Sequence, residues 1–124
     1  MLGKLQYLTV THLDIVYAIN LLSQFVAAPR RTHMVAVERV LRFLKCTPGQ
    51  GILLTAKGPM KLEAYCDADW AGCLDTRQSC TGYLIKVGGS PVSWKSKKQS
   101  MVARSSVDAE YRAMATTVSE VIWL

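Results

Sequence analysis

Two aspartates, Asp67 and Asp69, stand at the end of a stretch in which apolar and polar side chains alternate. The alternation over residues 61–67 predicts a β-strand, and the two carboxylates share one side of it if the strand continues. Carboxylates at a strand end suit Mg²⁺, which prefers oxygen ligands and keeps several waters, so that few protein ligands suffice. The alternative is structural, because an aspartate before Gly72 also caps a turn well.

Glu110 is the second acidic candidate, and it lies near the start of a helix predicted for the end of the chain. Ser105 and Asp108 have the spacing of a capping box, and an acid in the first turn suits the helix dipole. Asp108 lies about 200° around the helix from Glu110, so the two cannot share one site. The alternative for Glu110 is an ordinary solvated helix residue beside the expected core stripe of Tyr111, Ala115, Val118 and Ile122.

A group of basic residues falls between the last predicted strand and this helix, beside Trp94. Basic side chains next to an aromatic ring can contact phosphates and stack on sugar or base. The alternative is a solvated loop without a ligand. The candidate nucleic-acid-binding residues are Lys95, Lys97, Lys98 and Arg104.

The elements that must position these residues follow from apolar spacing. Helical spacing predicts a pair of helices, over residues 13–26 and from about residue 32 to residue 45. Alternation predicts strands over 61–67, 81–87 and 91–94, and Gly88-Gly89 is a tight turn that makes the last two antiparallel neighbours. We therefore expect a mixed α+β fold: an N-terminal helix pair, then three antiparallel strands, then a helix.

Composition narrows the class of protein without choosing a function. The 124 residues are 50% hydrophobic and carry a net charge of +6, which favours polyanions only weakly. No stretch approaches the roughly 20 apolar residues of a membrane span, so we expect no membrane partner. The four cysteines lack the close pairs of zinc sites, and reduced thiols favour an intracellular protein, cytoplasmic or nuclear, over a secreted one.

Several segments of the chain together resemble a known family. YCDADWAGCLDTRQSCTGYLIKVGGSPVSWKSKKQSMVARSSVDAEYRAM (65–114) is similar to the ribonuclease H region of Ty1/copia-type retrotransposon Pol polyproteins. LQYLTVTHLDIVYAINLLSQF (5–25) and ERVLRFLKCTPGQGILL (38–54) resemble the end of the reverse transcriptase in the same polyprotein. The resemblance implies a reverse transcriptase segment over residues 1–58 and the front part of a ribonuclease H-like domain over 59–124.

The resemblance also implies an activity, a cofactor and two site residues. Members of the family hydrolyse the RNA strand of RNA–DNA hybrids with two Mg²⁺ or Mn²⁺ ions. Asp67, in the motif Y-x-D-A-D-W-A-G, and Glu110, in S-S-x-x-A-E-Y, match the first two catalytic metal ligands. Asp69 belongs to the copia-type motif but matches no general ligand of these enzymes.

The resemblance places the third and fourth acidic ligands beyond residue 124. We therefore expect the chain to be part of a longer Pol polyprotein, to work with the remainder of it, and to be inactive in isolation. The alternatives are a non-catalytic basic module that binds nucleic acid, and a decayed retroelement remnant without a function.

Overall fold

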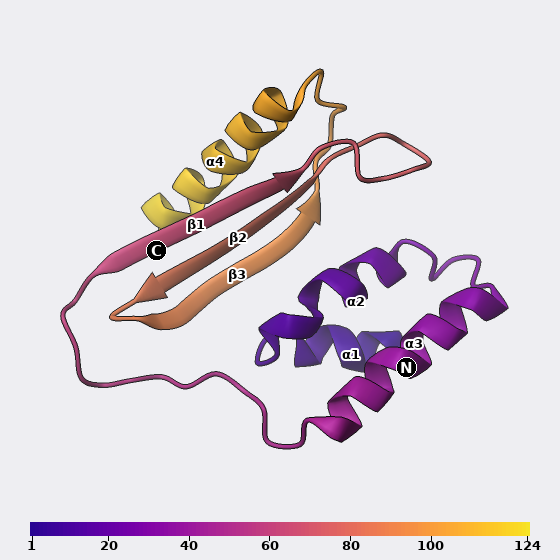
Figure 1. The fold of residues 1–124 in the computed structure, drawn as a ribbon, viewed down its shortest axis with the longest axis horizontal. Helices are drawn as coiled ribbons and strands as arrows, with labels where there is room; N and C mark the ends of the chain where they lie inside the picture. The colour runs from indigo at the N-terminus through magenta and orange to yellow at the C-terminus, as the bar shows by residue number, and fades with distance from the viewer. The chain divides into compact units, whose positions relative to one another are not determined.

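The computed structural model describes residues 1–124 and divides into two compact units, Met1–Ile52 and Leu53–Leu124 (Figure 1). The expected boundary, between residues 58 and 59, lies within the irregular segment that precedes the first strand. No helix is long and apolar enough to cross a membrane. All four cysteines are free thiols.

The first unit is helical. It contains α1 (Leu2–Leu8), a short 3-10 helix η1 (Leu13–Ile15), α2 (Val16–Ser23) and α3 (Arg31–Cys46). The predicted helix pair corresponds to α2 and α3, while α1 was not predicted because seven residues are too few to show helical spacing. The helices meet in one apolar core, whose buried members are Leu5, Ile15, Ile19 and Val37.

The second unit is built on a three-stranded antiparallel sheet in the order β1-β2-β3. The strands are β1 (Leu62–Asp69), β2 (Cys80–Val87) and β3 (Ser90–Lys98). A two-residue turn joins β2 to β3, and its residues Gly88 and Gly89 have φ values of 57° and 81°. Such left-handed backbone conformations favour glycine and match the twist of a hairpin, which is why Gly-Gly predicts this turn.

Helix α4 (Ser106–Trp123) lies alongside β1 and runs back along it from the end of that strand (Figure 1). Its buried residues are Ala109, Ala113 and Thr117. The predicted core stripe was therefore wrong, since three of its members are at least half exposed. Small residues let the helix backbone approach the sheet closely, whereas the larger apolar side chains point outward, namely Tyr111, Val118 and Ile122.

The mixed α/β class and the three antiparallel strands followed by a helix are confirmed, and they are consistent with an incomplete ribonuclease H-like fold. The third strand is longer than expected. β3 continues to Lys98 because β2 offers it backbone partners as far as Cys80, which pairs with Lys98. Three of the four candidate basic residues consequently lie in a strand, and their predicted position in a loop was wrong.

Candidate metal-binding site

Asp67 lies near the end of the edge strand β1 and is exposed. Its strand partner is Gly82, whereas its neighbour Ala68 pairs with the buried Thr81. Paired residues share a sheet face and successive residues alternate between faces. Asp67 therefore lies on the face opposite to Thr81, and its carboxylate forms no hydrogen bond or ion pair.

Glu110 lies in the first turns of α4, next to the buried Ala109, and it is exposed. No hydrogen bond or ion pair occupies its carboxylate. The start of α4 and the end of β1 lie at the same end of the sheet (Figure 1). The fold therefore brings the two segments that carry Asp67 and Glu110 to one end of the second unit. It does not bring the two side chains onto one face, because α4 contacts the face of Thr81 through Gln99 and Asp67 lies on the opposite face.

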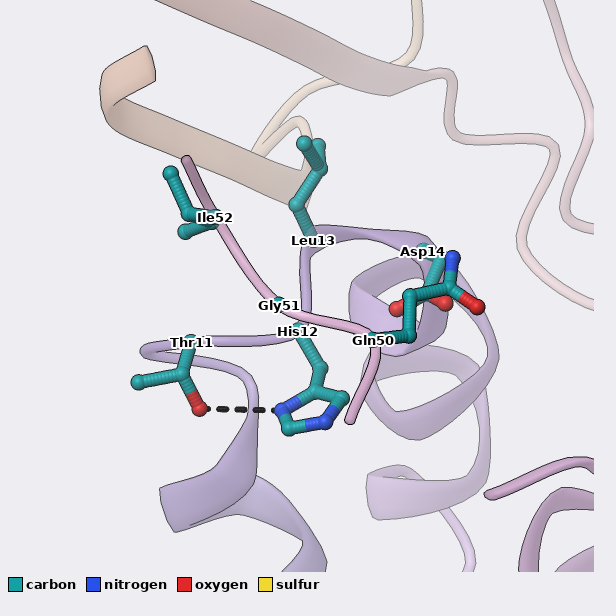
Figure 2. Close-up of a pocket in the computed structure, with 7 residues that line it drawn as sticks. All are labelled: Thr11, His12, Leu13, Asp14, Gln50, Gly51 and Ile52. Carbon is teal, nitrogen blue, oxygen red and sulfur yellow. Dashed lines mark hydrogen bonds between the residues drawn. The ribbon is translucent and has the colours of Figure 1, made fainter. Parts of the chain in front are cut away.

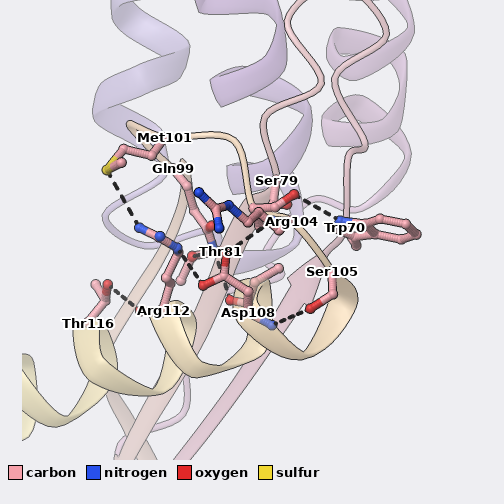
Figure 3. Close-up of polar contacts among 12 residues, drawn as sticks. Trp70, Ser79, Thr81, Gln99, Met101, Arg104, Ser105, Asp108, Arg112 and Thr116 are labelled. Atoms are coloured by element: carbon pink, nitrogen blue, oxygen red, sulfur yellow. Dashed lines mark hydrogen bonds and ion pairs between the residues drawn. The ribbon is translucent and has the colours of Figure 1, made fainter.

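Two side chains tie the start of α4 to the strands (Figure 3). The Gln99 Nε2 donates to the hydroxyl of Thr81 at 3.0 Å and to the carbonyl of Ala109 at 2.9 Å. The indole of Trp70, directly after β1, donates to the carbonyl of Ala103 at 3.3 Å. Because Thr81 pairs with a β1 residue, these bonds fix the end of β1 and the first turn of α4 relative to each other.

Gln99 and Ser79 hold the site in place and were not identified from the sequence. Gln99 follows a run of lysines and serines, and Ser79 is one of many serines, so neither stands out by type or spacing. Ser79 is fully buried, and its hydroxyl accepts a hydrogen bond from the backbone N–H of Ala71 at 3.1 Å. The Oε1 of Gln99 is buried without a partner, at a cost of about 1–3 kcal/mol for such a group.

One half of the predicted capping box of α4 is confirmed, the bond that Ser105 accepts, whereas the side chain of Asp108 accepts the N–H of Arg104 and not that of Ser105 (Figure 3). The hydroxyl of Ser105 accepts a hydrogen bond from the backbone N–H of Asp108 at 3.2 Å. The Asp108 carboxylate accepts the backbone N–H of Arg104 at 3.1 Å and the Nε of Arg112 at 3.0 Å. The bond from Arg104, with the charge of Arg112, lowers the pKa of Asp108. Asp108 thus serves the helix end, and its oxygens are already engaged.

Asp69 has a structural environment that Asp67 lacks. Its carboxylate lies against Gly72 so closely that a Cβ on that residue would collide with it. Ala71, directly before Gly72, has a φ of 53°, so the chain turns sharply here. The environment of Asp69 therefore agrees with the turn alternative, whereas Asp67 has no such role.

The candidate basic residues do not form one group. Lys95 and Lys97 pair with Tyr83 and Thr81 and share the sheet face of those residues, whereas Lys98 lies on the opposite face. The Nζ of Lys98 is 2.9 Å from the Sγ of Cys73.

The contact with Lys98 changes the chemistry of Cys73. Together with hydrogen bonds from Thr76, it lowers the pKa of the Cys73 thiol to about 6. This pair could not be predicted from local spacing, because Cys73 and Lys98 stand 25 positions apart.

The oxygen donors suit a hard cation, but they are few. No group of three or more His, Cys, Asp or Glu side chains is placed to hold a metal ion. Mg²⁺ in proteins commonly has one or two carboxylates besides water and substrate oxygens. The free carboxylates of Asp67 and Glu110 are of the right chemical type, and together they make an incomplete set for two ions.

The first unit contains a pocket of about 70 Å³, lined by residues 11–14, which include the start of η1, and by residues 50–52 after α3 (Figure 2). The hydroxyl of Thr11 is 2.9 Å from the Nδ1 of His12 at its rim. The volume is well below the roughly 300 Å³ at which ligand pockets begin. We assign it no ligand.

Comparison with known proteins gives strong matches over nearly the whole chain. It is 50% identical over 98% of its length to the retrovirus-related Pol polyprotein from transposon RE1 of Arabidopsis thaliana, and 42% identical over 98% to that from transposon TNT 1-94 of Nicotiana tabacum. It spans only 8% and 9% of those two polyproteins.

A much shorter relative matches equally well. The secreted RxLR effector protein 161 of Plasmopara viticola is 46% identical over 98% of the chain, which covers 87% of that protein. No family model matches the chain. No solved structure matches it either. Because the matches to several such polyproteins extend over nearly the whole of this chain, it belongs to the family of retrovirus-related Pol polyproteins from copia-type transposons.

Proposed function

We propose that the second unit is part of a ribonuclease H-type site that hydrolyses the RNA strand of RNA–DNA hybrids, with Asp67 and Glu110 as two of its metal ligands. The observation that carries the proposal is the pair of exposed carboxylates without protein partners at the end of β1 and the start of α4, segments that meet at one end of the sheet. Because Asp67 lies on the sheet face away from α4, its side chain would have to turn around the edge of β1 to share a cation with Glu110. Identity of about 50% to Pol polyproteins supports the same assignment.

The surroundings of each acidic residue determine which role it would have. Bound Mg²⁺ or Mn²⁺ would supply activation of a water and stabilisation of the leaving oxygen. Asp67 and Glu110 would hold the cation, because neither carboxylate has a competing partner. Asp108 would hold the helix end and Asp69 the turn, since their oxygens already lie against protein groups.

The proposal includes low activity of this chain by itself. Two ions bring four positive charges, and two carboxylates offset only half of them. Asp69 shares the sheet face of Asp67, but no third acid is placed to complete a metal-binding group, so the cations would be weakly held and poorly oriented. The remainder of a Pol polyprotein would supply the missing ligands and the partner surfaces.

A cleavage assay with a labelled RNA–DNA hybrid in Mg²⁺ or Mn²⁺ tests the proposal. The pure chain is expected to cleave at close to the background rate. Robust turnover that D67N or E110Q abolishes, while the control D75N retains it, would confirm the ligands and contradict the expected inactivity. Turnover that survives both D67N and E110Q would contradict the assignment of the site.

A further inference from the structure

The net charge of the chain is concentrated in the helical unit. Residues 1–52 contain six basic and two acidic side chains, whereas residues 53–124 contain nine and seven. Most of the excess in the first unit comes from α3, which carries four basic residues and one acid, Glu38. A helix with this imbalance produces a local positive potential that attracts polyanions.

Three cations of α3, Arg31, Arg39 and Arg42, lie on the helix side away from its core contacts, and Lys45 lies at the edge of that side. Val37 is buried in the core, and Val40 and Leu44 pack against it. At 100° per residue, Arg42 lies about 140° from Val37 and about 160° from both Val40 and Leu44. The basic face of α3, which is exposed throughout, consists of Arg31, Arg39, Arg42 and Lys45.

These cations are largely without protein partners. Only Arg42 has an acidic neighbour, Glu38 at 4.0 Å, and both side chains are more than half exposed. An exposed pair of this kind contributes little, and Arg31, Arg39 and Lys45 form no ion pair. The face is therefore free to pair with external anions.

The chemistry of the face favours phosphates on a polymer. Three of its four cations are arginines, whose planar guanidinium can bind a phosphate with two parallel hydrogen bonds. Residues 31 and 45 are about 21 Å apart along the helix axis, a length over which one strand of a duplex presents about six phosphates.

A membrane surface fits less well than a nucleic acid. An amphipathic helix that lies on a bilayer inserts its apolar face, and the apolar face of α3 is already packed on Leu5, Ile15 and Ile19. The other large apolar side chains of α3 are each more than half covered, so the helix offers a bilayer much charge and little apolar insertion; they are Met34, Val35, Leu41 and Phe43.

We infer that the basic face of α3 binds the phosphate backbone of a nucleic acid, at a surface distinct from Asp67 and Glu110. The choice of nucleic acid as the polyanion rests on the proposed function. The contact has no base specificity, because its groups are cations and none is arranged to read base edges.

Binding of a short labelled RNA–DNA hybrid, followed by fluorescence anisotropy in EDTA over a range of salt concentrations, tests the inference. The variant R39Q/R42Q/K45Q should reduce the slope of log K against log salt by about 2–3. Between 50 mM and 200 mM salt, the affinity of the parent chain should therefore fall roughly 40-fold more than that of the variant. Glutamine preserves helix propensity, so the fold should persist, which circular dichroism checks.

A control of equal charge separates the face from general electrostatics. K57Q/K61Q/R77Q removes three exposed cations from the second unit and should leave the slope nearly unchanged. E38Q removes the single acid of α3 and should tighten binding several-fold, a gain that misfolding cannot imitate. Equal losses in both triple variants, no gain in E38Q, or no binding by the parent chain would overturn the inference.

Two further arms separate this inference from the metal site and from membranes. D67N should bind the hybrid in EDTA as tightly as the parent chain, so that failure of the metal site leaves the inference standing. Vesicles rich in phosphatidylserine should bind weakly. Tight vesicle binding that R39Q/R42Q/K45Q abolishes, with hybrid binding unchanged, would overturn the inference in favour of a membrane.

Discussion

Asp67 and Asp69 show what residue types can and cannot reveal. The motif marks both carboxylates, and the sequence offered a metal ligand or a turn cap for either. The structure distinguishes them, because Asp69 lies against Gly72 while Asp67 has no protein partner. That difference depends on the path of the chain after β1, where Ala71 adopts a positive φ that its residue type does not suggest.

Cys73 should react as a thiolate near neutral pH. With a pKa of about 6, its alkylation by iodoacetamide should reach half its maximal rate near pH 6. K98M removes the ammonium group and should move this midpoint upward by more than one pH unit. Mass spectrometry of the separate peptides measures each cysteine, and exposed Cys46 is the internal control.

A Cys73 midpoint that K98M leaves in place would show that Lys98 does not stabilise the thiolate. The rate at high pH is a further check on the same variant. At high pH the alkylation rate of Cys73 should be nearly the same in K98M and in the parent chain, because the thiol is then fully ionised in both.

Asp108 should make the stability of the second unit depend on acid pH. Its pKa is lowered in the folded chain, so its contribution is present above the unfolded pKa of about 3.9 and is lost as pH falls through the folded value. D108N should lower the Tm at pH 7, and its difference from the parent chain should shrink as pH falls through the lowered pKa of Asp108.

The capping variant S105A is the matched control for this dependence. It loses a neutral hydrogen bond, so it should cost about 1 kcal/mol at every pH. An equal, pH-independent loss in D108N would contradict a role for the Asp108 charge.

The existence of helix α4 could be predicted from the sequence, but the face that it buries could not. The spacing of its apolar residues gave the existence and the start of the helix, but it chose the wrong face. Two stripes compete, one of large apolar residues and one of alanines with Thr117, and only the distance to the sheet decides between them. A helix that packs closely on a sheet selects small residues, and no local spacing carries that information.

Substitutions on the two faces of α4 should therefore have opposite consequences. A113L inserts a large side chain where the present residue has no exposed surface, and it should destabilise the second unit by about 1–3 kcal/mol. I122T alters a side chain that is 80% exposed and should change the free energy of unfolding by less than about 0.5 kcal/mol.

Urea denaturation followed by circular dichroism measures both variants of α4. The reverse order, with I122T more damaging than A113L, would restore the stripe that the sequence predicted. Similar losses in the two would mean that both faces are buried in solution.

For the whole molecule, local patterns predicted the class and the order of elements, whereas a division of the chain came only from the resemblance, at residues 58 and 59, and the compact units divide after Ile52. Helical spacing and strand alternation are local, so they gave α2, α3, three strands and α4 in order. The division after Ile52 depends on which side chains meet, as in the cluster around Ile19, and such contacts join residues far apart in sequence. The family assignment came from matched segments, which record ancestry and not packing.

Core substitutions should act within their own unit. I19A removes a side chain that is 1% exposed in the helical core and should destabilise residues 1–52 by about 2–5 kcal/mol. I85A removes a fully buried side chain of β2 and should destabilise residues 53–124 in the same way. Amide hydrogen exchange followed by mass spectrometry should show faster exchange only in the unit that carries the substitution, and uniform acceleration in both would mean that the chain unfolds as one.

The most direct test of the central claim is paramagnetic broadening by Mn²⁺ in NMR spectra of the labelled chain. A cation shared by Asp67 and Glu110 should broaden amide signals at the end of β1 and in the first turns of α4 together. D67N and E110Q should each reduce the effect in both segments, and D75N should not. Broadening confined to one segment, or unchanged in D67N and E110Q, would contradict the proposed site.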